Sequence, residues 1–203
     1  MRDDGRPVTG GYLKGRIRRE DIITAAVAVY GEAGYHGSSL REIAKRAGIT
    51  HAGLLYYFPT KEALLAAVLE RRDAEDAERE QLEAPPGLDV LRHFLALAEH
   101  NVRHPGIVEL YSRLAAEAVA VDHPAHDYFV RHYRGAREGV VDSFRALADS
   151  GELRPDVDPA TAALTFIALM DGLQVQWLTT PDEVDLVGSL RFYLRNLLTV
   201  PLD

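Results

Sequence analysis

The sequence contains no cysteine among its 203 residues. This absence excludes disulfides, thiolate metal sites and a cysteine nucleophile, and it is typical of a reducing compartment. Long apolar runs are also missing, since neither terminus carries a stretch that suits a signal peptide or a membrane span. We therefore expect an intracellular, cytoplasmic protein that does not contact a membrane.

The chain as a whole also lacks the excess of positive charge that is typical of nucleic-acid-binding proteins. Its formal net charge is −8. The charges are unevenly distributed, however, because residues 1–62 hold 10 Lys or Arg against 7 Asp or Glu, and the remaining residues hold 13 against 24. Only the weakly basic N-terminal part is therefore expected to meet a polyanion.

Motifs of the common enzyme classes are missing too. We find no serine motif, glycine-rich phosphate loop or spaced metal triad. One segment, "DHPAHD", brings together groups that could converge on a divalent ion, namely Asp122, His123, His126 and Asp127, with His132 farther on. The simpler interpretation is that Asp122 or His123 caps a helix whose first residue is Pro124. We expect neither an enzyme nor a bound cofactor or metal.

What the sequence does contain is apolar residues at helical spacing, interrupted by glycines and prolines. The pattern predicts helices over residues 18–33, 39–47, 50–58, 60–81, 88–103, 106–121, 124–150, 159–178 and 183–198. No stretch is typical of a strand. The predicted fold class is all-α, with an N-terminal three-helix head, a connecting helix and a larger C-terminal helical bundle.

Four parts follow from this pattern. Residues 1–17 are rich in Gly and Arg and have no apolar period, so we expect a mobile basic arm. The head occupies residues 18–60 and the connecting helix residues 61–83. "APPG" then breaks the helical pattern, and residues 84–203 form the larger bundle.

The head has the pattern of a helix-turn-helix. In "LREIAKRAGITHAGLL", residues 40–55, Ala44 supplies a small side chain where two helices cross, and Gly48 tolerates a positive φ in the turn. Ser39 and Thr50 are the expected N-caps of the two helices. A plain helical hairpin with a glycine turn is the alternative interpretation.

A longer segment around this motif carries a family resemblance. Residues 34–65, "GYHGSSLREIAKRAGITHAGLLYYFPTKEALL", closely resemble the DNA-binding signature of the TetR family of bacterial transcriptional regulators. Weaker similarities in the body, "HPGIVELY", "HPAHDYF" and "DGLQVQWL", resemble the regulatory domain of an actinobacterial branch of that family. The resemblance implies a ligand-responsive repressor, released from a near-palindromic operator by a small molecule.

The resemblance also implies which residues contact DNA. The matching positions are Ser39, Arg41, Thr50, His51, Ala52, Gly53, Tyr57 and Lys61. This sequence departs from the family pattern at Leu55, where a tyrosine is usual, and at Gly53, which is often threonine or asparagine. Both differences remove hydrogen-bonding groups, so a smaller set of contacts is expected here.

The chemistry of the recognition helix agrees with these roles. His51 could donate to a purine N7 or a guanine O6 in the major groove, while Ala52 and Gly53 allow close approach. A solvated histidine without a contact is the alternative. The basic arm is either a disordered tail or a probe of the minor groove, through Arg2, Arg6, Lys14, Arg16, Arg18 and Arg19.

Three consecutive aromatic residues end the recognition helix and cannot all face one way. Phe58 follows Leu54 by four residues and is expected to anchor the helix on the core. Tyr57 is expected to offer its hydroxyl to a phosphate, and Tyr56 is left open between the two roles. Lys61 opens the next helix, where a lysine opposes the helix dipole, and this favours a phosphate contact.

The larger bundle is expected to bind a ligand and to dimerise. The last two helices carry apolar stripes, and the resemblance implies that they pack against their own copies in a four-helix homodimer interface. The predicted interface residues on the last helix are Val187, Leu190, Leu194 and Leu197. Two copies are needed because one short recognition helix reads few base pairs. Candidates for the walls of an effector pocket are Phe94, Tyr111, Tyr133, Phe166, Met170, Gln174 and Trp177. Ordinary core packing explains each of these residues equally well.

The predicted partners are therefore double-stranded operator DNA, a second copy of the chain and a small-molecule effector. The alternative is a helical small-molecule- or metal-binding protein whose head is only structural. Affinity for random duplex DNA at low salt distinguishes the two, because only the first requires it. A regulator without an effector, or one that activates, fits the same residues.

Overall fold

Helices account for most of the chain in this computed structural model, which describes residues 9–79 and 85–202. Over these residues the backbone forms α1 (Thr9–Gly37), α2 (Leu40–Arg46), α3 (His51–Tyr57), α4 (Lys61–Arg79), α5 (Leu88–Arg103), α6 (Pro105–Glu117), α7 (His126–Asp149), α8 (Pro159–Thr179) and α9 (Leu186–Leu197). The described residues contain no strand, only an isolated bridge between Leu153 and Leu198. The predicted all-α class is confirmed. No helix in this part of the chain is long and apolar enough to span a bilayer.

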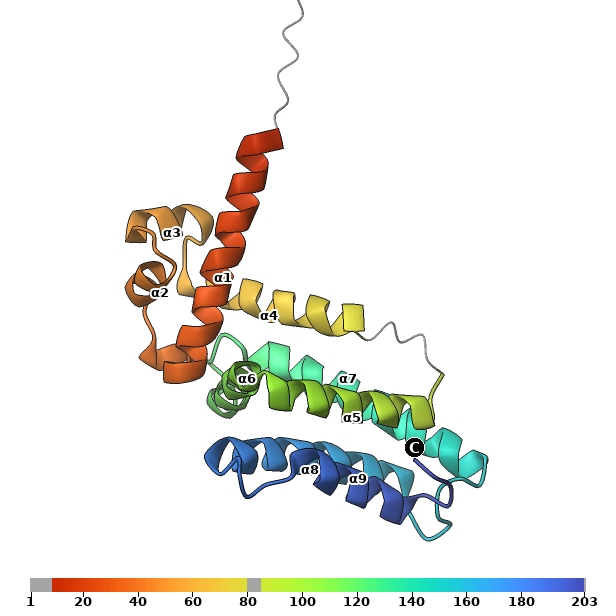
Figure 1. The fold of residues 1–203 in the computed structure, drawn as a ribbon. Coiled ribbons are helices and arrows are strands. Elements are labelled where there is room, and N and C mark those ends of the chain that lie inside the picture. Colours follow the sequence, from red (N-terminus) through yellow and green to blue (C-terminus); the bar gives the residue numbers. More distant parts are fainter. Residues whose placement is uncertain (1–8, 80–84, 203) are drawn as a thin grey trace, which may run out of the picture.

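The helices are arranged as a head and a body, with α4 between them (Figure 1). The helices α1, α2 and α3 lie together at one end of the molecule, and α4 runs from them along the body. Within the body, α5, α6 and α7 lie between α4 and the terminal pair, α8 and α9. This arrangement matches the head, connecting helix and larger bundle that the sequence predicts.

The predicted start of the first helix is wrong. α1 begins at Thr9 and not at Arg18, so residues 9–17 belong to this helix. This end of α1 projects beyond the other helices (Figure 1). Residues 1–8 lie outside the described part of the chain, and so do the predicted groove contacts of Arg2, Arg6 and the side chains of Lys14 and Arg16.

The predicted start of α7 is also wrong, by two residues. The helix begins at His126 and not at Pro124, because residues 118–125 make turns. The Nδ1 atom of His123 accepts a hydrogen bond of 3.1 Å from the Ala125 N–H. His123 therefore organises the turn before α7, but the N-cap of the helix is Ala125, which makes no side-chain capping bond, so the capping interpretation of Asp122 or His123 is wrong.

One contiguous set of buried side chains extends from the head into the body. Ile43, Ala44 and Leu54 are at most 1% exposed and pack against α1 and α4. The same cluster includes Leu114 from α6 and Phe129 from α7. Each buried aliphatic side chain contributes roughly 1.5–3 kcal/mol, so the head is firmly packed on the body. A second cluster fills the space between α5, α7, α8 and α9.

A polar contact at a kink in α1 also ties the head to the body. Gly34 has φ 73° and ψ 177°, which interrupts the helix where the sequence predicts a stop. The Tyr35 N–H donates to Glu117 Oε2 of α6 at 2.7 Å. A Cβ at position 34 would lie 2.0 Å from Glu117 Oε1. Glycine therefore permits both the left-handed backbone and the close approach of the carboxylate.

Candidate DNA-binding surface and effector cavity

The turn between α2 and α3 is fixed by local hydrogen bonds. Gly48 has φ 66°. Its N–H donates to the Lys45 carbonyl at 3.2 Å, and the Ile49 N–H donates to the Ala44 carbonyl at 3.0 Å, which closes α2 in a Schellman motif. The Ser39 hydroxyl accepts the Glu42 N–H at 3.2 Å and caps α2. The Thr50 hydroxyl accepts the Gly53 N–H at 3.0 Å and caps α3. The predicted helix-turn-helix is confirmed.

The recognition helix α3 has a buried and an exposed face. Leu54 is 0% exposed and Phe58 3%, so Phe58 anchors the helix on the core as expected. The Arg19 guanidinium covers its ring, 5.0 Å from the centroid. The outer face is therefore free to enter a groove without disturbing the packing of the head.

The outer face of α3 is formed by two pairs of adjacent residues, one helical turn apart: His51 and Ala52, then Leu55 and Tyr56. Tyr56, which sequence reasoning left undecided, belongs to the surface because it is 83% exposed. Tyr57 is half-buried, packs against the head core and meets the Tyr56 ring edge-on at 5.2 Å. Tyr56 therefore presents a hydroxyl on this face, next to the apolar Leu55.

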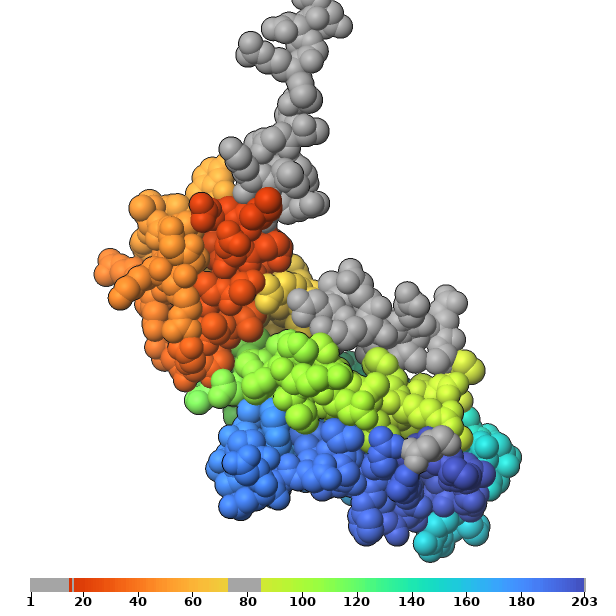
Figure 2. Space-filling view, viewed as in Figure 1, coloured from red at the N-terminus to blue at the C-terminus, as the bar shows by residue number. Residues whose placement is uncertain are grey.

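Exposed cations of α2 lie on the same outer end of the molecule. Figure 2 shows α2 and α3 there, on the side of the head away from α8 and α9. Arg41 and Lys45 are exposed. Arg46, by contrast, forms a two-pronged pair with Glu32 at 2.5 and 2.8 Å. Arg41 and Lys45 are therefore better placed than Arg46 to meet phosphate.

Lys61 has a structural role that sequence reasoning missed. Its Nζ donates to the carbonyls of Tyr35 and Ser38, the latter at 2.6 Å, and lies 4.4 Å from the centroid of the Tyr35 ring. Burial lowers the pKa of the Lys61 ammonium, although Glu117 and Glu62 act in the opposite direction. Two of its three N–H groups thus bind the end of α1. A phosphate contact by Lys61 stays a prediction and depends on the third.

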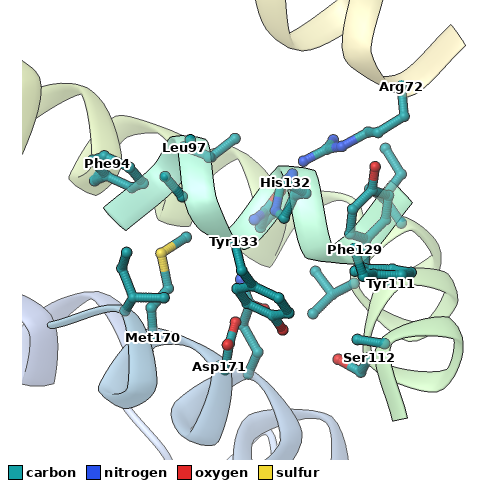
Figure 3. A pocket seen from close by; sticks show the side chains of 18 of the residues that line it. Arg72, Phe94, Leu97, Tyr111, Ser112, Phe129, His132, Tyr133, Met170 and Asp171 are labelled. Carbon is teal, nitrogen blue, oxygen red and sulfur yellow. The ribbon is translucent and has the colours of Figure 1, made fainter. Parts of the chain in front are cut away.

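A cavity of about 670 Å³ lies inside the body (Figure 3). Its walls come from α4, α5, α6, α7 and α8. Residues from the predicted pocket set that line it are Phe94, Tyr111, Tyr133, Met170 and Gln174. Aromatic and apolar walls with a few polar groups are typical of a small-molecule site.

The two remaining candidates for the pocket wall, Phe166 and Trp177, do not line the cavity, so the prediction is wrong for them. Phe166 is 0% exposed, packed edge-on against Phe94 at 5.6 Å and stacked on Tyr193 at 6.3 Å. Trp177 is buried in the same cluster and does not belong to the cavity wall. Both side chains point to the core side of α8, which apolar periodicity does not distinguish from the cavity side.

The polar residues of the cavity were missed from the sequence. Arg72 of α4 is buried, and its guanidinium lies 5.2 Å from the centroid of the Tyr111 ring. It stands in the charge run "ERRDAEDAERE", which reads as a solvated helix surface. His132 of α7 and Asp171 of α8 also line the cavity. The sequence did contain a signal for Asp171 as a lining residue. It adjoins Met170 and precedes Gln174 by three residues, and both of these were predicted to line the pocket.

Asp171 gives the α8 side of the cavity a distinct electrostatic character. Its carboxyl is hydrogen-bonded with the Tyr133 hydroxyl. Burial raises the pKa of Asp171 above its ordinary value, although the bond with Tyr133 acts in the opposite direction. Burial and the nearby carboxylate likewise raise the pKa of Tyr133. Figure 3 shows these two side chains together, with Arg72 entering from α4 on the opposite side of the cavity.

Two family models match the sequence, one for each half of this architecture. The model for bacterial regulatory proteins of the tetR family matches residues 22–68, which contain the helix-turn-helix. The model for the C-terminal part of BetI-type transcriptional repressors matches residues 94–199, more than half of the chain. The protein belongs to the TetR family.

Named relatives of this TetR-family protein are regulators too. The A-factor receptor protein of Streptomyces griseus is 26% identical over 180 residues, which cover 87% of this chain and 61% of that protein. The fatty acid metabolism regulator protein of Bacillus subtilis is 26% identical over 193 residues, 91% of this chain and 95% of that one. The chain therefore spans about three fifths of the length of the first relative and nearly all of the second.

Solved structures of the same fold extend the comparison. A transcriptional regulator from Saccharomonospora viridis, solved in complex with choline, has a TM-score of 0.74 at 22% identity. The match covers 91% of this chain and 100% of that one. At this level of identity the similarity establishes the arrangement of the helices and nothing about the ligand.

The predicted dimer residues of this TetR-family protein require a correction. Leu190 and Leu194 are 0% exposed and belong to the body's own core, while Val187 and Leu197 pack against it. Leu190 and Leu194 therefore have no surface left for a partner, whereas Val187 and Leu197 are only half-buried. The apolar stripe of α9 is real, but α5 and α8 already cover it.

A different apolar surface remains exposed on the terminal helices. α8 is apolar on nearly all sides, and its outward residues include Leu164, Ala168, Gly172 and Val175. Leu164 is 57% and Val175 52% exposed, and Phe192 of α9 is 72% exposed. This outward stripe is less rich than the one that the core buries, and the predicted interface residues do not include it.

The histidine cluster around residue 123 does not converge on one point. His123 accepts the Ala125 N–H in the turn before α7, and its Nε2 lies 3.5 Å from Glu117 Oε2. The Nδ1 atom of His126 hydrogen-bonds with the Ala118 carbonyl at 2.9 Å. His132 lines the effector cavity. Each histidine therefore has a separate structural environment.

Proposed function

We propose that this protein is a cytoplasmic transcriptional repressor that binds a near-palindromic operator as a homodimer and is released by a small molecule in the body cavity. The observation that carries the proposal is the shared wall between cavity and head. Phe129 lines the cavity and belongs to the buried cluster that supports α3, and Tyr111 and Tyr133 pack against that cluster. An occupant of the cavity thus presses on side chains that position the head.

The exposed face of α3 supports the DNA-binding part of the proposal. His51, Ala52 and Tyr56 are arranged to enter a major groove, where a histidine can donate to purine N7 or guanine O6. The predicted phosphate contacts are Tyr57 and Lys61. Ser39 and Arg41 at the start of α2, and Thr50 at the front of α3, are further predicted DNA contacts. The Thr50 hydroxyl accepts the capping bond and keeps its own proton for a phosphate oxygen. Base contacts would give sequence preference, and phosphate contacts would give orientation.

The exposed apolar surface of α8 and α9 supports the homodimer. Leu164, Val175 and Phe192 expose large apolar side chains, while Ala168 and Gly172 between them allow a partner helix to approach closely. A second copy suits this surface because its own α8 carries the same stripe, and two-fold contacts are self-complementary. Two recognition helices would then read half-sites about 34–36 Å apart.

Release by a ligand requires that the effector prefer one spacing of the two heads. The cavity wall includes Arg72 of α4, and α4 begins directly after the recognition helix. A ligand that displaces α4 or Phe129 can favour a spacing that does not match the half-sites. A typical coupling of about 1–3 kcal/mol would weaken operator affinity roughly 5- to 150-fold. By reciprocity, the operator would weaken ligand binding by the same factor.

The test is a footprint on DNA flanking the gene, repeated with candidate metabolites. We expect a protected near-palindrome at physiological salt and loss of protection with one class of compound. His51→Ala should weaken that footprint, whereas Asp142→Asn, an exposed change on α7, should leave it unchanged. Equal binding to random duplex DNA and to flanking DNA would contradict the operator. Equal effector affinity with and without operator would contradict the switch.

A further inference from the structure

The charge that the cavity favours in a ligand depends first on Asp171. This carboxyl projects into the cavity from α8, and the Tyr133 hydroxyl is the partner that the described residues give it. A carboxylate in an apolar wall is costly unless a donor or a cation compensates it. The wall beside it, Phe94, Met170 and Tyr133, supplies no such charge.

The aromatic lining makes the same region suitable for a cation. Phe94 from α5, Tyr111 from α6, and Phe129 and Tyr133 from α7 all border the cavity. Aromatic faces attract ammonium and guanidinium groups, most strongly where water is excluded. The protein already uses this attraction, because the Arg72 guanidinium lies 5.2 Å from the centroid of the Tyr111 ring.

The positions of the charges separate the two ends of the cavity. Figure 3 shows Arg72 entering from α4 on one side and Asp171 beside Tyr133 on the other, with Phe94 and Met170 to the left of both. The Arg72 side is occupied by the protein's own cation on Tyr111. A ligand cation therefore gains most at the Asp171 side, away from that guanidinium.

We propose that the effector is an amphipathic organic cation, with a substituted ammonium group beside Asp171 and Tyr133 and an apolar body along Phe94, Leu97 and Met170. The existence of an effector rests on the proposed function, but the charge preference of the cavity does not. A cavity of about 670 Å³ accommodates an aryl or alkyl ammonium of drug size. An anion would meet the Asp171 carboxylate, and a neutral ligand would leave it uncompensated.

The binding test uses three probes of similar shape that differ in charge: phenyltrimethylammonium, tert-butylbenzene and benzenesulfonate. Titration calorimetry on the full chain should give the cation an affinity at least about 10-fold above that of the other two. Asp171→Asn keeps the size and a hydrogen bond with Tyr133. This substitution should lower the affinity for the cation about 10-fold and leave the affinity for tert-butylbenzene unchanged. Asp142→Asn removes an exposed carboxylate of α7 and should change neither of these two affinities.

A pH series adds a readout that a merely structural role of Asp171 would not move. Burial raises the pKa of this carboxyl, so a bound cation must displace its proton at low pH, and cation affinity should rise with pH through that range. His93 of α5 and His132 of α7 also line the cavity, as does Arg72 of α4. Protonation of these two histidines at low pH would also weaken cation binding, but the Asp171→Asn protein contains the same histidines. The difference between the two proteins therefore isolates Asp171.

Three outcomes would overturn the proposal: equal affinity for the three probes, preference for benzenesulfonate, or unchanged cation affinity in a folded Asp171→Asn protein. Binding of none of the probes would overturn it as well. Thermal melting of each variant without ligand verifies that it is folded. A gel shift on the footprinted DNA separates this failure from failure of the proposed function. Operator binding that another class of compound reverses would keep the repressor and reject only the cation.

Discussion

The head and the body of this protein use the same element, the α-helix, with different packing. In the head, Ile43, Ala44 and Leu54 are at most 1% exposed and leave the short helices α2 and α3 no freedom against α1. The body leaves a cavity of about 670 Å³ between its helices and places Arg72 and Asp171 in its walls. A tightly packed unit keeps a recognition helix in a fixed shape, whereas a hollow one can respond to an occupant.

If that difference is correct, equivalent truncations in the two regions should have unequal effects. Leu54→Ala removes a fully buried side chain and should lower the free energy of unfolding by about 2–5 kcal/mol, because the filled core cannot relax. Leu97→Ala, at the half-buried edge of the cavity, should cost clearly less. Urea unfolding of both variants measures this. Similar losses would mean that the body is packed as tightly as the head.

The exposed apolar surface of α8 and α9 is the proposed dimer interface of the body, and charge placed there should act on assembly. Phe192→Arg should yield monomers with strongly reduced operator affinity and little change in thermal stability, because this ring is 72% exposed. Leu194→Arg provides the contrast, since a buried charge should unfold the body. Sedimentation velocity and gel shift distinguish the two. A dimeric Phe192→Arg protein would move the interface elsewhere.

The joint between head and body should be sensitive to a single Cβ. Gly34→Ala places a side chain at φ 73° and against Glu117 Oε1, so we expect a loss of about 1–3 kcal/mol in stability. Operator affinity should also fall, because the head would shift on α6. Gly37→Ala is the matched control, with its Cβ in ordinary contact at 3.5 Å. Equal melting temperatures for the two variants would show that the joint tolerates a side chain.

Within the head, base and phosphate contacts should respond differently to DNA sequence. His51→Ala should cost roughly 1–3 kcal/mol at the preferred operator and much less on random DNA. Arg41→Ala should weaken both alike and reduce the salt dependence by about one unit of slope. Gel shifts at several salt concentrations measure both effects. Equal losses on both DNAs for His51→Ala would remove its role in sequence reading.

The smallest effect we expect is a pH dependence of the joint, through His123. Burial lowers the pKa of this histidine below its ordinary value of 6.5, and His36 acts in the same direction, whereas Glu117 and Asp122 oppose it. Its Nδ1 accepts the Ala125 N–H, so a proton on Nδ1 would break that bond. The unfolded chain therefore binds the proton more readily, and stability is lost as pH falls below about 6.5.

Urea unfolding at pH 7, 6 and 5 measures this loss. His123→Gln should flatten the pH dependence over this range, and His51→Gln, on the exposed face of α3, should retain it. Parallel curves for all three proteins would remove His123 as the source.

Local chemistry made much of the head predictable. A capping hydroxyl at Ser39 or Thr50 and a left-handed glycine at Gly48 act on backbone groups within three or four residues, so the sequence alone specifies them. The same holds for the spacing that buries Leu54 and Phe58 on one face of α3. The all-α class and most helix boundaries follow from apolar period and breakers in the same way.

Only the tertiary structure decided which neighbour covers each helical face. Apolar period marks Leu190, Leu194 and Phe166 as buried, but the core of the same chain covers them, and not a partner or a ligand. Arg72 lines the cavity only because α4 crosses above Tyr111. The Tyr35–Glu117 hydrogen bond joins residues 82 positions apart, and no local pattern encodes such a distance. Periodicity fixes a face relative to its own helix axis, whereas contacts depend on how the axes cross.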